Sequence, residues 1–131
     1  MSSAMKSTGA VVAGFFTVFV LSLVTDQVLH MLKVYPPWGQ SMSSGLFLLA
    51  TSYRLLYTVL GGYLTARLAP HTPLRHAVIL GLVGTAAGIA GVVATINKPE
   101  LGPAWYPIVL AVTAFPATWL GGFLYERRAG Q

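Results

Sequence analysis

The chain has 131 residues, of which 55% are hydrophobic and only 8% are charged, and its formal net charge is +5. A soluble domain carries charge on roughly a quarter of its residues, so this chain lacks the polar surface that a water-facing fold needs. The absence of cysteine excludes disulfides and thiolate metal sites. These properties predict an integral membrane protein whose main solvent is lipid.

Four apolar segments follow one another along the chain. They run from residues 9 to 32, 45 to 68, 74 to 96 and 104 to 125. Each holds about 22–24 residues, close to the ~20 that a helix needs to cross the hydrocarbon core. Because backbone polar groups in lipid must be paired within the segment, these runs are expected to be helices.

Proline and glycine separate the apolar segments. Pro36-Pro37-Trp38-Gly39 follows the first, Pro70 and Pro73 lie between the second and third, and residues 97–103 separate the third from the fourth. These residues end helices or start turns. The connections are short, so consecutive helices are expected to be antiparallel neighbours. We therefore predict one all-α domain over residues 1–131, a transmembrane four-helix bundle with up-down-up-down topology.

Basic residues are distributed unequally between the two ends of the predicted spans. Five lie at the end that carries both termini and two at the other, and they are Lys6, Arg67, Arg75, Arg127 and Arg128 against Lys33 and Lys98. The positive-inside rule then places both termini in the cytoplasm and the protein in the plasma (inner) membrane. The aromatic residues Tyr35, Trp38, Trp105 and Tyr106 are interpreted as a belt at the outer boundary. The basic residues form no stripe interleaved with aromatic residues, so nucleic acid is not an expected partner.

The two halves of the chain show a weak internal sequence repeat. The glycine pair and arginine of residues 61–67 recur in residues 121–127, and the small-apolar start of residues 10–14 resembles residues 77–81. Two helical hairpins of the same orientation are one explanation. Chance recurrence of short glycine-rich strings in membrane helices is the other.

Two opposite charges, Asp26 and Arg54, lie inside predicted spans. Measured from the centres of their spans at 1.5 Å per residue, Asp26 lies ~7–8 Å and Arg54 ~4–5 Å toward the outer side. Charges inside a membrane are costly and usually paired. The similar depth on adjacent helices predicts an ion pair between them.

Three further residues extend this polar group. His30 lies one turn after Asp26, while Tyr53 and Tyr57 flank Arg54. In a functional interpretation, Asp26 and His30 handle a proton or cation and Arg54 binds an anion. In a structural interpretation, the two charges form a fixed clasp that holds the first hairpin together, and this is the one we favour.

Small residues line the third segment. Gly84, Gly88 and Gly91 let another helix approach closely. We expect this contact to be within the molecule, with the first or second span, and keep a dimer interface as the alternative.

Several short motifs are spread over nearly the whole chain: Thr25-Asp26, Tyr35-Pro36-Pro37, Tyr53-Arg54, GGYLTARLAP at residues 61–70, His76-Ala77 and Trp105-Tyr106-Pro107. In these motifs the chain resembles small four-span bacterial inner-membrane proteins that have no assigned activity. The resemblance implies fold and membrane location only.

Three functional hypotheses follow. The first is an accessory or structural subunit that packs against the helices of a larger membrane complex. The second is a small oligomeric transporter or channel that uses the polar pocket around Asp26, His30 and Arg54. The third, a membrane enzyme acting on lipid or quinone, is the least favoured, because no nucleophile–base pair is apparent. The three histidines fit no zinc spacing, so neither a metal nor a cofactor is expected.

Overall fold

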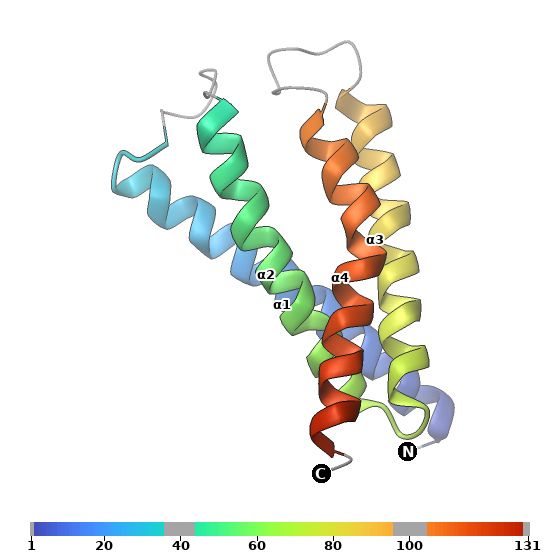
Figure 1. The fold of residues 1–131 in the computed structure, drawn as a ribbon. Coiled ribbons are helices and arrows are strands. Elements are labelled where there is room, and N and C mark those ends of the chain that lie inside the picture. Colours follow the sequence, from blue (N-terminus) through green and yellow to red (C-terminus); the bar gives the residue numbers. More distant parts are fainter. Residues whose placement is uncertain (1, 36–43, 96–104, 130–131) are drawn as a thin grey trace.

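The structure, a computed structural model, describes residues 2–35, 44–95 and 105–129. Across these ranges the chain forms four α-helices and no strands, namely α1 (Ser3–Met31), α2 (Ser44–Leu68), α3 (Pro73–Thr95) and α4 (Trp105–Ala129) (Figure 1). The prediction of an all-helical chain is therefore confirmed. The turns predicted at residues 36–39 and 97–103 lie outside the described residues.

The helices coincide with the four apolar segments but extend further at the ends near the chain termini. α1 begins at Ser3, because the Ser2 hydroxyl accepts a hydrogen bond from the Met5 amide (3.2 Å) and so caps the helix. α4 continues to Ala129, since the polar residues after the apolar run are good helix formers. At the start of α3, Pro73 occupies the first helical position, where its missing N–H costs nothing.

Three of these helices are long and apolar enough to cross a membrane. They are α1, α3 and α4, with mean hydropathies of 2.0, 2.2 and 1.6 in their most apolar windows. α2 has 25 residues but is not one of the three, and it carries Arg54 together with three tyrosines. Length and composition thus indicate a membrane protein. They identify α1, α3 and α4 as candidate membrane spans and do not identify α2 as one.

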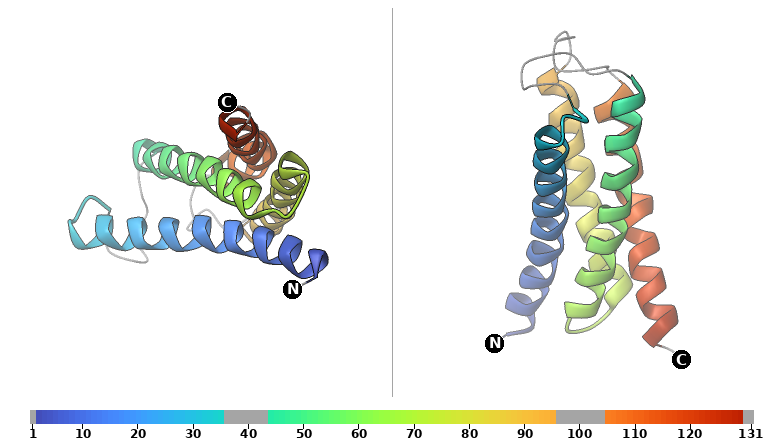
Figure 2. Two further views of the ribbon diagram at one scale, coloured as in Figure 1. Left: turned by 90° about the horizontal axis from the view of Figure 1, so that it is seen from below. Right: turned by 90° about the vertical axis from the view of Figure 1, so that its left-hand side faces the viewer.

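Consecutive helices run in opposite directions, and both chain termini lie at the same end of the molecule (Figures 1 and 2). At that end the helices approach one another closely, and the axes of α2 and α4 diverge toward the other end (Figure 1). The side chains explain this shape. Toward the terminal end, small residues lie between the helices, so the helices come close together. Toward the opposite end, the rings of Phe47 and Tyr106, with centroids 4.9 Å apart, lie between α2 and α4.

Backbone contacts between helices form the core at the terminal end. A Cβ built on Gly121 would lie 2.0 Å from the Val59 carbonyl oxygen, and one on Gly62 would lie 2.3 Å from the Thr118 carbonyl oxygen. α2 and α4 therefore touch reciprocally, each through a glycine. Most of the buried residues around these contacts are small, beside the larger His76 and Leu80: Ala10, Gly14, Thr65, Ala66, Ala77, Ala114, Ala117 and Thr118. Such residues allow close helix packing where lipid removes the hydrophobic drive between helices.

The glycines of α3 pack within the molecule, but against a different helix from the one expected. Carbons added at Gly84 and Gly88 would meet Ala114 and Ala111 of α4, at 3.2 and 2.6 Å. The assignment of this contact to the first or second span was wrong. α3 and α4 are joined directly in sequence, and alanines on α4 match the glycines of α3. For a carbon added at Gly91, the described residues place no atom within 4 Å.

The close contact at Gly121 gives a direct test of the packing. Gly121→Ala places a methyl group against the backbone of α2, so we expect the free energy of unfolding in mild detergent to fall by about 2–3 kcal/mol. Gly91→Ala is the matched control, because the same methyl group meets no atom of the described residues within 4 Å. That variant should keep or slightly raise the stability. Equal losses in the two variants would contradict the observed packing.

Candidate functional site: the Asp26–Arg54 network

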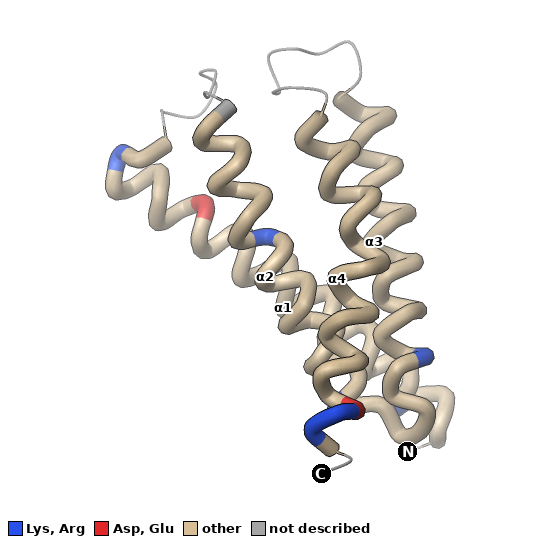
Figure 3. Tube along the Cα trace, viewed as in Figure 1, with Lys and Arg blue, Asp and Glu red and all other residues tan. Residues whose placement is uncertain are grey.

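The structure brings Asp26 of α1 and Arg54 of α2 together as an ion pair, in which Arg54 Nη2 donates to Asp26 Oδ2. The Asp26 side chain is 15% exposed and the Arg54 side chain 26% exposed, so both charged groups are largely buried. The pair lies in the half of the molecule away from the termini, where Figure 3 shows an acidic position on α1 beside a basic position on α2. Close packing of Gly14 against the Gly61 carbonyl sets the antiparallel register that makes these two positions level.

Tyr53 occupies the other carboxylate oxygen, because its hydroxyl donates to Asp26 Oδ1. The Tyr53 hydroxyl is also 2.8 Å from the Tyr35 hydroxyl. Since the proton of Tyr53 is directed to Asp26, Tyr35 is the donor to Tyr53. An ordered chain therefore runs from Tyr35 through Tyr53 to Asp26, and both oxygens of the carboxylate have protein donors.

Tyr35 belongs to this network. From the sequence, this residue was expected in an aromatic belt at the membrane boundary. It follows the end of α1, is only 3% exposed, and returns toward α2 after Lys33, whose φ of 62° lies in the left-handed region. Burial raises the pKa of its phenol above the usual value of 10.0. The Tyr35 hydroxyl thus keeps its proton and remains a donor.

Tyr57, also expected in this group, bonds to Thr25 and not to Asp26. Its hydroxyl is 2.7 Å from the Thr25 hydroxyl, which itself donates to the Leu21 carbonyl (2.8 Å). Tyr57 is consequently the donor to Thr25. This second bond between α1 and α2 lies beside the first, since the rings of Tyr53 and Tyr57 are 5.9 Å apart.

His30 lies at the edge of the network. Its ring packs edge-on against the Tyr35 ring, with centroids 5.3 Å apart. Tyr106 of α4, which was also assigned to the belt, packs its ring against the Phe47 ring of α2, with centroids 4.9 Å apart.

Two buried polar atoms of the described chain have no hydrogen-bond partner, Arg54 Nε and Ser22 Oγ. Ser22 lies one turn before Asp26 on α1. Each carboxylate oxygen of Asp26 thus accepts a hydrogen bond, whereas the buried Nε–H of Arg54 has no acceptor among the described residues. Within the described ranges no three His, Asp or Glu side chains come together as a possible metal site.

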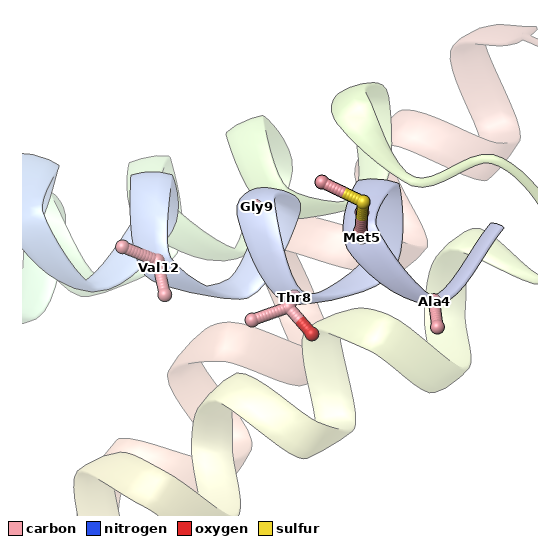
Figure 4. Close-up of a pocket in the computed structure, with 5 residues that line it drawn as sticks. All are labelled: Ala4, Met5, Thr8, Gly9 and Val12. Atoms are coloured by element: carbon pink, nitrogen blue, oxygen red, sulfur yellow. The ribbon is translucent and has the colours of Figure 1, made fainter. Parts of the chain in front are cut away.

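A separate hollow lies along the first turns of α1, near the opposite end of that helix from Asp26 (Figure 4). Its volume is about 460 Å³, and its lining consists of Ala4, Met5, Thr8, Gly9 and Val12. All five residues belong to α1 and none is charged, so the hollow is an apolar recess on one helix surface and has no part in the network.

Comparisons with known proteins add no family. No family model, no curated protein and no solved structure matches the chain.

Two neighbouring tyrosines test the network. Tyr53→Phe removes a hydrogen bond to a charged carboxylate, so we expect a loss of about 1.5–3 kcal/mol in the free energy of unfolding. Tyr57→Phe deletes the same atom from a neutral hydrogen bond and should cost about 0.5–1.5 kcal/mol. Chemical denaturation in mixed micelles measures both. If Tyr57→Phe were the more damaging change, the assignment of the Asp26 donor would be wrong.

Proposed function

We propose that the chain is a four-span protein of the plasma (inner) membrane with both termini in the cytoplasm, built as two similar helical hairpins. Three helices meet the length and hydropathy expected of spans. For α2, the ion pair with Asp26 lowers the cost of placing Arg54 in lipid. The reciprocal glycine contacts of α2 and α4 support the repeated hairpins, and the excess of basic residues at the terminal end supports the orientation.

Within the membrane, we propose that the protein serves as an accessory or structural subunit that packs against other membrane helices. The observation that carries this proposal is the bonding of Asp26, whose two carboxylate oxygens are both occupied by donors of the same chain. A carboxylate held in this way is a poor carrier of protons or cations. It is well suited to hold α1 and α2 in one arrangement.

α1 supplies the surface for such packing. It buries only Ala10, Gly14 and Ser22 and leaves large apolar side chains uncovered along its length, including Phe16, Phe19, Leu23 and Val24, which are 49–56% exposed. Lipid or a neighbouring helix covers these side chains in a membrane. A helix attached to its own molecule mainly on one side is available to a larger complex.

A small oligomeric transporter or channel is the second candidate. The chain of hydroxyls from Tyr35 through Tyr53 to Asp26 favours it, because hydrogen-bonded rows of this kind conduct protons. The His30 ring lies against the Tyr35 ring at the start of this row.

The topology has a direct test, because the chain has no cysteine and single cysteines report their own position. Val34→Cys should react with a membrane-impermeant maleimide on intact cells. Ala129→Cys should react only after the membrane is permeabilised. Labelling of both sites on intact cells, or of neither, would contradict a membrane-crossing chain with a cytoplasmic C-terminus.

The role is tested by Asp26→Asn together with native mass spectrometry. An accessory subunit should co-purify with other membrane proteins, and Asp26→Asn should lower its abundance several-fold, because losses of 1–2 kcal/mol change cellular levels by about that factor. Gln27→Ala, a change at the adjacent exposed position, should leave abundance unchanged. A homo-oligomer whose abundance is unaffected by Asp26→Asn would favour the transporter instead.

A further inference from the structure

The end of the molecule that carries both termini is strongly basic (Figure 3). Its basic side chains are all exposed: Lys6, Arg67, Arg75, Arg127 and Arg128. The acidic residue at this end, Glu126, accepts a hydrogen bond from the Leu74 amide at the start of α3 (3.0 Å). Across the part of the chain that the structure describes, Asp26–Arg54 is the ion pair found, so these five cations have no carboxylate partner there.

Two of the arginines lie in the last turns of α2 and α4. Arg128 Nη1 of α4 donates to the Tyr63 hydroxyl of α2 (3.2 Å), and the Tyr63 and Tyr125 rings pack edge-to-face with centroids 5.5 Å apart. Arg67 lies four residues after Tyr63 and is its neighbour on the same face of α2. Tyr63 thus accepts a hydrogen bond from the Arg128 guanidinium of α4 and has Arg67 one turn further along its own helix.

An apolar stripe continues from this pair toward the middle of the helices. On α2, Leu56 and Leu60 share the face of Tyr63 and Arg67 by helical spacing, and they are 58% and 46% exposed. On α4, Leu124 lies one turn before Arg128 and is 42% exposed. A surface with two cations at its end and exposed leucines along its length matches the two chemical parts of a phospholipid.

We propose that Arg67 and Arg128 bind the phosphate of an anionic phospholipid of the cytoplasmic leaflet, with its acyl chains along Leu56, Leu60 and Leu124. Guanidinium groups form paired, charge-assisted hydrogen bonds with phosphate oxygens. Basic sites between membrane helices on the cytoplasmic side are suited to such headgroups. Free phosphate uses the two arginines but has no part that needs the leucines. This inference depends on the proposed membrane location and orientation.

The test uses purified full-length protein in mild detergent, after extraction from alkali-washed membranes has established that the protein is membrane-integrated. Adding phosphatidylglycerol should raise the thermal midpoint by about 5 °C, and phosphatidylcholine or inorganic phosphate should have much smaller effects. In Arg67→Gln and in Arg128→Gln, at least half of this rise should be lost.

Arg127→Gln is the matched control, since it removes the same charge one residue away. Successive residues lie about 100° apart around an α-helix, so Arg127 lies on a different side of α4 from Arg128. This variant should keep the full rise. An equal loss in Arg127→Gln, or an equal rise with inorganic phosphate or phosphatidylcholine, would overturn the lipid site. Recovery of the protein in the soluble fraction would instead overturn the proposed membrane location.

Discussion

A carboxylate and a guanidinium placed in helices that are otherwise apolar impose the main constraint on this molecule. Both side chains are largely buried, and a largely buried charge is costly unless a charge of opposite sign lies beside it, so each of the two stabilises the other. Together with the packing of Gly14 against the Gly61 carbonyl, their contact constrains the rotation of α1 about its axis and its depth relative to α2. Tyr53 and Tyr35 then bond to the remaining carboxylate oxygen and to each other.

The first hairpin is held differently at its two ends. Toward the termini, Gly14 lies against the Gly61 carbonyl, and the Thr65 hydroxyl donates to the Ala10 carbonyl (2.9 Å), so the helices meet backbone to backbone. Toward the other end, polar side chains join helices that are further apart. The two arrangements complement each other, because close packing tolerates no large side chain and a buried charge needs long ones to reach its partner.

Much of the fold was predictable from the chain alone. Apolar runs of sufficient length predicted the four helices, and depth along the spans predicted that Asp26 and Arg54 lie level. The partner of Gly84 and Gly88 was not predictable, since a face of small residues permits close approach without specifying which helix approaches. Tyr35 was missed for a related reason. It lies beyond the end of α1, and its return toward Tyr53 depends on the left-handed backbone at Lys33, which no helical spacing reveals.

The central claim is that Asp26 and Arg54 act as a structural clasp, and exchanging the charges tests it most directly. The free energy of unfolding would be measured for Asp26→Arg, for Arg54→Asp and for the double variant. Each single variant leaves like charges together and should lose about 2–4 kcal/mol, somewhat less than the ~3–5 kcal/mol of a fully buried pair because both side chains are partly exposed. The clasp predicts that the double variant recovers at least half of the summed loss. A double variant as unstable as the two single variants combined would contradict it.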